Sequence, residues 1–364
     1  MKKHRYKLLA LITEAYGECG GIAQYNRDFL EALADSALFS SITVLPRYAR
    51  DSVNPPSAIQ QLTARTTRFA YSIVAFRKAL FASIDVVFCG HLYMAPLAAL
   101  IAWMKRAKLI VQTHGVEAWP RPSRLLQLAV ERADLVLSVS RYTRAAVLGW
   151  AAIVPERALV VPDTFREVFT PGDGSKQRAS LGLEGKRVLL TVGRMVASER
   201  YKGQERVMVA ILELVKRGHD ICYLIVGEGD DRSRLEALAA EIGVNDRVKF
   251  LGAIDLQTLI ETYRAADVFV MPSTGEGFGV SFLEAMASGI PALGLDVAGA
   301  RDALGDGELG PCVSECDLVR TIDHLLNHRK AEHDGIPVAV RRRFGRECFS
   351  GTVQSAINRL VEAA

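Results

Sequence analysis

Cysteine is scarce in this chain, and the sequence has no long apolar run. The six cysteines among 364 residues show no metal-ligand spacing, which favours buried, reduced thiols in a cytosolic protein. The apolar run at residues 94–104 is too short to span a bilayer. No Gly-x-Gly-x-x-Gly follows the first apolar segment, where "GECGGIA" only partly approaches it, so a dinucleotide dehydrogenase is disfavoured.

The first residues, "MKKHRYKLLALITEAYG", place basic side chains before apolar ones, as a signal peptide does. The apolar run is short, however, and it reaches Glu14 without a small-residue cleavage site. We therefore interpret this stretch as a first buried strand.

Charge is distributed unevenly along the chain. Residues 1–165 carry 20 Lys and Arg against 12 Asp and Glu, whereas the remainder carries 25 against 29. A basic half indicates an anionic partner, such as a phosphorylated molecule, a nucleic acid or an anionic membrane surface. Scattered, solvated basic residues are the alternative explanation.

Short apolar runs rich in Val, Ile and Leu alternate with helical patterns, which is typical of parallel strands covered on both faces. This alternation predicts an α/β protein with doubly wound, Rossmann-like sheets. A chain of this length is expected to form two domains. The expected strands are 6–13, 41–45, 85–89, 108–113 and 134–140 in the first series and 187–193, 222–227, 247–252 and 267–272 in the second.

Pro162, Pro171, Gly172 and Gly174 lie between the two series, which indicates an interdomain linker. We expect domains at residues 1–165 and 166–344, facing a cleft. Ligands of such sheets bind beyond the carboxyl ends of the strands, so the functional loops should follow the strands.

The stretch "STGEGFGVSFLEAMASGIPAL" (273–293) connects an expected strand to an apolar helix that begins near Val280. Gly277 and Gly279 allow a tight turn, and the helix start offers unpaired amides and a positive dipole end to an anion. Glu276 lies before the helix and Glu284 in its first turns. The two carboxylates either bind hydroxyl groups of a ligand or only cap the helix and complement its dipole.

Glu276 and Glu284 lie eight positions apart, and the sequence between and after them resembles the E-x7-E motif of retaining family 4 glycosyltransferases. Further similar segments occur in the family's order, so the resemblance covers residues 6 to 325. They are "GGIAQYNRDF", "THG", "VVPD", "VGR", "KG", "VGEGD" and "RVKFLG". The resemblance implies two Rossmann-like domains of the GT-B type and a nucleotide-sugar donor.

The resemblance also implies roles for individual residues. Arg194 and Lys202 are similar to the family's phosphate-binding Arg and Lys, which stabilise the negative charge of the leaving diphosphate. The sequence separates them by eight positions where many relatives have six. His114 would contact the transferred sugar near the reacting carbon, Glu276 its hydroxyl groups and Glu284 the ribose.

The other expected donor contacts come mostly from backbone near strand ends. The Gly20–Gly21 pair would meet phosphate or acceptor, although taken alone it indicates only a turn. Glu228 and Lys249 would line the nucleotide pocket. The amides of the helix-start loop would bind phosphate; its residues are Gly277, Phe278, Gly279 and Val280. No Asp-x-Asp triplet occurs, so we expect no metal and no cofactor.

Contacts to the acceptor are the least specified. Glu14, Tyr16, His91 and Tyr93 lie in strand-end loops of the first domain and are weak candidates. A helix from about residue 345 is expected to return to the first domain, as in related enzymes.

Residues 65–81, "RTTRFAYSIVAFRKALF", mix basic with aromatic and aliphatic side chains. Such a segment lies in a membrane interface or packs as an amphipathic helix on the first sheet. With the basic first domain, it suggests a polyprenyl-linked acceptor at the inner face of the cell membrane.

The sequence thus predicts a cytoplasmic retaining glycosyltransferase, peripheral to the membrane in one version of the hypothesis. Its partners would be a GDP- or UDP-sugar and a hydroxyl acceptor such as a lipid-linked saccharide, without nucleic acid. The alternatives are a nucleotide-sugar epimerase of the same architecture and a non-catalytic two-domain protein that binds a small ligand.

Overall fold

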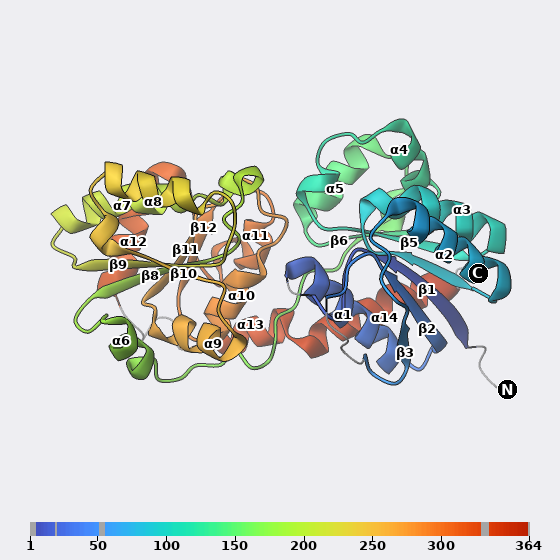
Figure 1. The fold of residues 1–364 in the computed structure, drawn as a ribbon, viewed down its shortest axis with the longest axis horizontal. Coiled ribbons are helices and arrows are strands. Elements are labelled where there is room, and N and C mark those ends of the chain that lie inside the picture. Colours follow the sequence, from blue (N-terminus) through green and yellow to red (C-terminus); the bar gives the residue numbers. More distant parts are fainter. Residues whose placement is uncertain (1–4, 19, 51–54, 329–334, 363–364) are drawn as a thin grey trace. The chain divides into compact units, whose positions relative to one another are not determined.

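The computed structural model describes residues 5–18, 20–50, 55–328 and 335–362. The first residues of the signal-like stretch, 1–4, and the last two of the expected C-terminal helix lie outside this part. The chain forms two units: unit 1 runs to Thr164 and resumes at Arg346, and unit 2 is Phe165–Gly345 (Figure 1).

Unit 1 is built on a sheet of seven strands in the order β3-β2-β1-β4-β5-β6-β7, all paired in parallel. Their apolar runs are buried on both faces, as the absence of polar alternation predicts. The strands are β1 Tyr6–Ile12, β2 Phe39–Pro46, β3 Ile59–Gln61, β4 Val86–Cys89, β5 Lys108–Thr113, β6 Leu135–Ser138 and β7 Ala158–Val160.

Helices cover both faces of this sheet. Phe29 of α1 stacks on Phe88 of β4 with ring centroids 4.4 Å apart, and α14 packs against α1 on that face. The helices α2 to α5 share one apolar core with Val87 and Leu9, which point to the opposite face. The helices are α1 Gly21–Asp35, α2 Arg68–Phe81, α3 Ala95–Lys105, α4 Arg124–Glu131, α5 Arg141–Trp150 and α14 Arg346–Glu362.

Unit 2 is built on a second parallel sheet, of six strands in the order β10-β9-β8-β11-β12-β13. Its first four strands lie within one residue of the predicted bounds. The strands are β8 Arg187–Val192, β9 Ile221–Val226, β10 Val248–Gly252, β11 Val268–Met271, β12 Ala292–Leu295 and β13 Cys312–Val313.

Helices of unit 2 also cover both sheet faces. Val207 of α7, Leu235 of α8 and Ile322 of α12 belong to one core, whereas Phe282 of α10 packs edge-on against Phe269 of β11 on the other face. The doubly wound α/β prediction is therefore confirmed. The helices are α6 Ser175–Leu181, α7 Gln204–Lys216, α8 Arg232–Glu241, α9 Leu256–Ala265, α10 Val280–Ala287, α11 Ala300–Ala303, α12 Leu318–Asn327 and α13 Ile336–Phe344.

Candidate active site

The loop between β11 and α10 is held in a tight, glycine-dependent shape. Gly279 precedes the helix with φ +100°, in the left-handed region, and no side chain caps the helix start. The Gly299 amide donates to the Glu276 carbonyl at 2.9 Å. A Cβ on Gly299 would lie only 2.0 Å from the Gly277 carbonyl oxygen, so only glycine fits there. The loop therefore presents uncapped helix amides in a fixed position.

Glu276 lies in this loop beside basic groups. The side chain is half-buried, and its Oε2 atom has no hydrogen-bond partner within the described residues. Burial raises the pKa of this carboxyl, Lys202 opposes the shift, and Glu199 reinforces it. A carboxylate oxygen without a partner can accept a hydrogen bond from a hydroxyl group of a ligand.

Glu284 lies in the first turns of α10 and has a partner that the sequence did not reveal. The Tyr263 hydroxyl, from α9, donates to Glu284 Oε2 at 2.8 Å. Burial raises the pKa of Glu284 to about 7, against the lowering effects of the Tyr263 hydrogen bond and of Arg166. Tyr263 thus fixes the orientation of this carboxylate.

Arg194 and Lys202 lie at the two ends of the loop that follows β8. Glu199 lies between them: its Oε1 accepts from Arg194, and its Oε2 is 3.4 Å from Lys202 Nζ. The Arg194 side chain is 71% exposed, whereas Lys202 and Glu199 are 15% and 12% exposed. The two cations are thus held around an internal carboxylate, a residue that our sequence reasoning did not single out.

This loop is tied to the β11–α10 loop. The Thr274 amide donates to the Tyr201 carbonyl at 2.8 Å. Gly203, with φ +77°, approaches so closely that a Cβ would lie 2.5 Å from the Pro272 carbonyl oxygen. The structure therefore brings Lys202 and the Glu276 loop together at the carboxyl ends of neighbouring strands β8 and β11.

The remaining unit 2 candidates differ in position. Glu228 follows β9, and its Oε1 accepts from the Ala253 amide at 3.3 Å, while its carbonyl accepts from Met195 next to Arg194. Lys249 lies within β10, opposite Leu224, and is exposed. Glu228 thus belongs with the strand-end loops, whereas Lys249 is part of an edge strand.

In unit 1, Gly20 and Gly21 begin α1 after the first strand. Gly20 has φ +117°, and no atom lies within 4 Å of a Cβ built on either glycine. No side chain caps α1. The helix start is therefore open, as a close approach of a ligand would require.

His114 follows β5 and is held by three contacts within unit 1. Its amide donates to Glu117 Oε1 at 2.5 Å, its Nε2 lies 2.9 Å from the Gly90 carbonyl, and its ring meets Tyr25 edge-on at 5.2 Å. A carbonyl only accepts, so Nε2 carries the proton and Nδ1 is left as an acceptor. Burial lowers the pKa of His114, which keeps the ring neutral.

The acceptor candidates are arranged in two ways. His91 is buried, with its ring 5.9 Å from that of His114, and burial lowers its pKa to about 4. Tyr93 is 64% exposed. Tyr16 is buried, and its hydroxyl is engaged with Glu31 at 3.4 Å; Glu14 accepts from Asn26 through its carbonyl. His91 thus lies beside His114, and the Tyr93 ring lies 4.0 Å from that of His91. The Tyr16 hydroxyl instead points to α1.

The structure adds residues to the site that no motif indicated. Tyr263 and Gly299 come from segments without a recognisable pattern. Glu199 lies in the loop whose length departs from that of many relatives, and that departure was the only signal for it. Among the described residues, no cluster of three or more His, Cys, Asp or Glu side chains could hold a metal ion.

Two family models match this chain. One, described as "Glycosyl transferases group 1", matches residues 173–339, and the other, described as "Glycosyltransferase Family 4", matches residues 19–163.

Curated relatives show similarity over part or most of their length. A GDP-mannose-dependent alpha-(1-6)-phosphatidylinositol monomannoside mannosyltransferase of Mycolicibacterium smegmatis is 32% identical, over 66% of this chain and 68% of the relative. A D-inositol 3-phosphate glycosyltransferase of Nocardia farcinica is 35% identical, over 56% of this chain and 47% of the relative. A 2-deoxystreptamine glucosyltransferase of Streptomyces kanamyceticus is 32% identical, over 64% and 58%. The chain thus spans about half the length of the latter two relatives.

Solved structures share the fold at low identity. HepE of Anabaena in complex with UDP and glucose superposes with a TM-score of 0.79 at 19% identity, covering 97% of this chain and all of that one. Sucrose-phosphate synthase from Thermosynechococcus elongatus superposes with a TM-score of 0.78 at 21% identity, covering 98% and 100%.

Proposed function

Because the chain belongs to the GT-B glycosyltransferases of family 4, a group of retaining hexosyltransferases, we propose a specific reaction for it. It transfers a hexose from a GDP- or UDP-sugar to a hydroxyl group of a lipid-linked saccharide. Unit 2 binds the donor and unit 1 contributes the acceptor side.

The observation that carries the proposal is the pairing of two loops in unit 2. The Lys202 loop and the Glu276 loop are joined by the backbone hydrogen bond from Thr274 to Tyr201, so cations and uncapped helix amides lie at neighbouring strand ends. Charge develops on the diphosphate as the glycosidic bond breaks, and fixed positive groups stabilise that charge. Arg194, Lys202 and the amides from Gly277 to Val280 perform this role without a metal ion.

Carboxylates bind the neutral parts of the donor in this proposal. Glu276 accepts from sugar hydroxyls through its unpartnered oxygen, and Glu284 accepts from the ribose while Tyr263 holds it. Glu228 lines the nucleotide pocket, and β10 contributes to this pocket through the backbone at Lys249. Retention follows from front-face substitution, in which the leaving phosphate helps take the acceptor proton.

The acceptor side is proposed from unit 1. The neutral His114 ring, held by Gly90 and Glu117, contacts the sugar near the reacting carbon, and the open helix start at Gly20 and Gly21 admits phosphate or acceptor. Among the acceptor candidates, His91 contacts His114 and Tyr93 contacts His91, whereas Glu14 and Tyr16 are secondary candidates.

The lipid-linked acceptor is proposed from two observations. The mycobacterial relative bears a name that describes a phosphatidylinositol mannoside as its acceptor. Unit 1 is rich in basic residues and exposes aromatic side chains. The enzyme would then work in the cytoplasm, at the inner face of the membrane. No helix within the described ranges is both long and apolar enough to cross a bilayer.

A donor panel tests the proposal. UDP, GDP, ADP and their sugars are compared by thermal shift, and donor consumption is then measured with and without extracts of lipid-linked saccharides. We expect one nucleotide to stabilise the protein and its sugar to be transferred only when acceptor is present. Conversion of the donor to an epimer without acceptor, or saturable binding without turnover, would contradict the proposal. We expect the rate to be unchanged in EDTA, because the proposal assigns the diphosphate to Arg194, Lys202 and backbone amides.

A further inference from the structure

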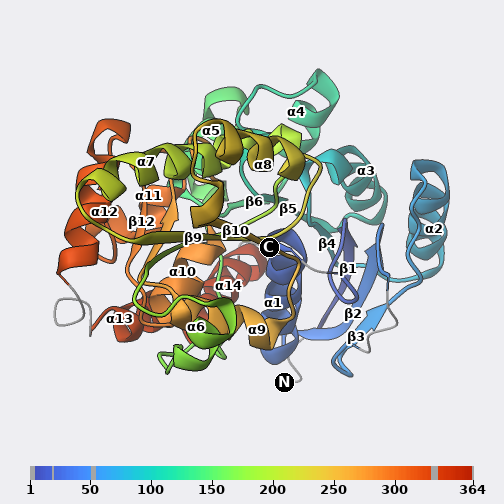
Figure 2. The ribbon, with the colours of Figure 1, turned by 60° about the vertical axis from the view of Figure 1, so that its left-hand side comes forward.

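Two histidines of unit 1 lie close together at the ends of neighbouring strands. β5 ends at Thr113, directly before His114, and β4 ends at Cys89, shortly before His91. The two strands pair in parallel, and Figures 1 and 2 show them side by side. Both histidines therefore lie at the carboxyl edge of the sheet, where their ring centroids are 5.9 Å apart and their ring planes are tilted by 39°.

A backbone carbonyl decides where the His114 ring carries its proton. Nε2 lies 2.9 Å from the Gly90 carbonyl oxygen, which only accepts, so Nε2 donates and Nδ1 is an acceptor. Gly90 is itself firmly held. Its amide donates to the Leu11 carbonyl at 2.8 Å, and a Cβ at this position would lie 2.6 Å from Ile12. The structure therefore fixes one tautomer of His114.

A backbone amide decides the tautomer of His91. Its Nδ1 accepts from the Tyr93 amide at 3.4 Å, so the proton lies on Nε2, which becomes a donor. The backbone of His91 is held as well, because its carbonyl accepts from the Met94 amide at 3.0 Å and from Cys89 Sγ at 3.2 Å. The nitrogen that His91 leaves free is thus a donor, whereas the one that His114 leaves free is an acceptor.

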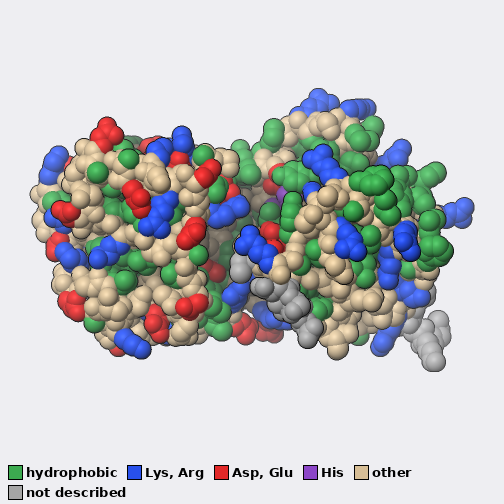
Figure 3. Space-filling model, viewed as in Figure 1, with side chains coloured by type: hydrophobic (Ala, Val, Ile, Leu, Met, Phe, Trp, Pro, Cys, Tyr) green, Lys and Arg blue, Asp and Glu red, His purple; other side chains and the backbone are tan. Residues whose placement is uncertain are grey.

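These two nitrogens have no hydrogen-bond partner in the described part of the chain. Neither is among the described buried atoms that lack a partner, so both reach solvent. Figure 3 shows a histidine at the surface of unit 1, whose described histidines are His91 and His114. Burial and the neighbouring His114 lower the pKa of His91 to about 4, and burial lowers the pKa of His114, while Glu117 opposes both shifts. Both rings are therefore neutral at neutral pH.

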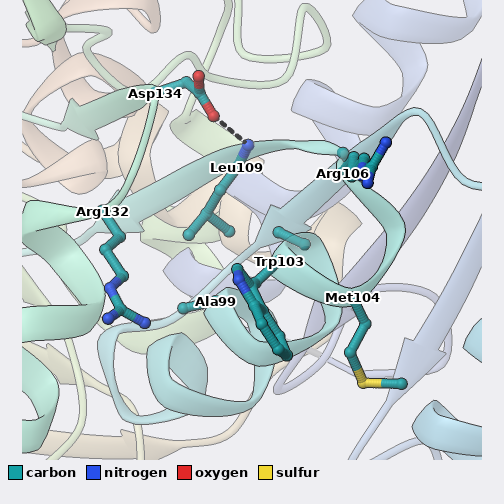
Figure 4. A pocket seen from close by; sticks show the side chains of 9 residues that line it. Ala99, Trp103, Met104, Arg106, Leu109, Arg132 and Asp134 are labelled. Atoms are coloured by element: carbon teal, nitrogen blue, oxygen red, sulfur yellow. Dashed lines mark hydrogen bonds between the residues drawn. The ribbon is translucent and has the colours of Figure 1, made fainter.

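An open groove of about 900 Å³ lies at the other edge of the same sheet. Figure 4 shows Trp103, Leu109 and Asp134 along it, and Leu109 belongs to the amino end of β5. The Asp134 carboxylate accepts from the Leu109 amide at 2.9 Å. Because ligands of parallel sheets bind beyond the carboxyl ends of the strands, the histidine pair is better placed than this groove to meet the substrate.

We propose that His91 and His114 together bind one hydroxyl group of the transferred hexose. His91 donates to the hydroxyl oxygen, and His114 accepts from the hydroxyl proton. A hydroxyl group both accepts and donates, whereas an ether or carbonyl oxygen would leave His114 without a partner. Two hydrogen bonds of about 2.8 Å that meet at one oxygen join nitrogens about 4.5 Å apart, which suits rings at this separation. The inference rests on the proposed function and assigns His91, an acceptor candidate, to the donor sugar.

NMR of the ligand-free chain tests the two tautomers. Long-range correlation of ring protons with ring nitrogens shows which nitrogen is protonated, and the variants His91→Asn and His114→Asn assign the signals. We expect both rings to be neutral and to carry the proton on Nε2 at about pH 7.5. A proton on Nδ1 of either ring, or a charged ring, would overturn the proposal.

Monodeoxy analogues of the donor test the bound hydroxyl. UDP-glucose and GDP-mannose are compared with their monodeoxy analogues by the kcat/KM of transfer. We expect the wild type to use one analogue about a hundredfold less efficiently than its parent, because a site built for a hydroxyl is left unpaired by its absence. All analogues being used as well as their parents would overturn the proposal.

His91→Asn separates hydrogen bonding to the sugar from a structural role. Asparagine retains an acceptor for the Tyr93 amide but lacks the donor at the position of Nε2. The discrimination against that one analogue should fall about tenfold, since only the parent loses a hydrogen bond. The His114 signal should persist and show that unit 1 stays folded. An equal loss of rate for parent and analogue would instead make His91 structural and overturn the pair.

His324→Asn is the matched control, because His324 is exposed on α12 of unit 2. It should discriminate between parent and analogue like the wild type. The outcomes also separate this inference from the proposed function. A wild type that consumes neither donor would refute the proposed function, whatever the tautomers are. A wild type that transfers a hexose without discriminating against any analogue would refute the histidine pair alone.

Discussion

The carboxylate of Glu199 lies between Arg194 and Lys202, pairing with the first and standing 3.4 Å from the second. If a donor diphosphate binds the same two cations, it must displace this internal anion. Glu199→Gln should therefore strengthen binding of the preferred nucleoside diphosphate. The gain should be about two- to fivefold, because the Arg194 partner is exposed to solvent and such an ion pair is individually weak. Isothermal titration calorimetry measures the change. Glu205→Gln, whose carboxylate pairs with Arg234, is the matched control. Weaker binding in Glu199→Gln would show that Glu199 instead holds the cations in place.

Glu276 and Arg194 should have separable roles. Glu276→Ala should lower the transfer rate by about a hundredfold or more, since an acceptor for sugar hydroxyls is lost in the transition state. Binding of the nucleoside diphosphate, which lacks the sugar, should remain close to that of the wild type. Arg194→Ala should weaken that binding directly. Calorimetry and single-turnover rates together check this, and equal loss of binding in both variants would contradict the division of roles.

The pKa of Glu284 makes donor binding depend on pH. Burial raises this pKa from 4.5 to about 7, so the carboxylate that accepts from ribose forms only as pH rises through about 7. Donor affinity should increase across that range. Tyr263→Phe removes the hydrogen bond that lowers the pKa, and it should move the increase to higher pH. Dissociation constants measured across pH check both, and a pH-independent affinity would contradict the ribose role.

The same pKa shift predicts a change in stability. Because the pKa of Glu284 is higher in the folded protein than in the unfolded chain, the folded protein binds this proton more tightly. Glu284 therefore makes its full contribution to the free energy of unfolding below about pH 4.5, where the carboxyl is protonated in both states. This contribution is lost as pH rises through about 7. Glu284→Gln, which stays neutral, should therefore gain stability over the wild type at pH 8 more than at about pH 5. Chemical denaturation at the two pH values measures the difference.

Gly299 should be intolerant of any side chain. A methyl group there would lie 2.0 Å from the Gly277 carbonyl, so Gly299→Ala must displace the β11–α10 loop. We expect nucleoside diphosphate affinity to fall about tenfold or more, as a backbone binding site loses its shape. Gly149→Ala is the control, because no atom lies within 4 Å of a Cβ built at that position. If Gly299→Ala bound the nucleoside diphosphate with unchanged affinity, the β11–α10 loop would not contribute to donor binding.

Periodicity was sufficient for the long strands but not for the short ones. Segments such as Arg187–Val192 and Ile221–Val226 were predictable because continuous apolar runs are needed by strands buried on both faces. The strands β3, β7, β12 and β13 were missed, because runs of two to four residues next to proline, glycine or polar residues carry too little pattern. Their places in the sheets depend on partners far along the chain.

What the sequence by itself determined is the doubly wound fold, the glycine-rich helix start and the family's pair of glutamates. Turns and buried strands require particular residue types at adjacent positions, so these features can be recognised from the local sequence without knowledge of distant contacts. Three contacts depend on the tertiary structure alone. Tyr263 orients Glu284, Gly299 packs closely against Gly277, and Glu199 lies between Arg194 and Lys202. Contacts of this kind join segments whose closeness results from sheet order and core packing, and no local pattern in the sequence encodes such distances.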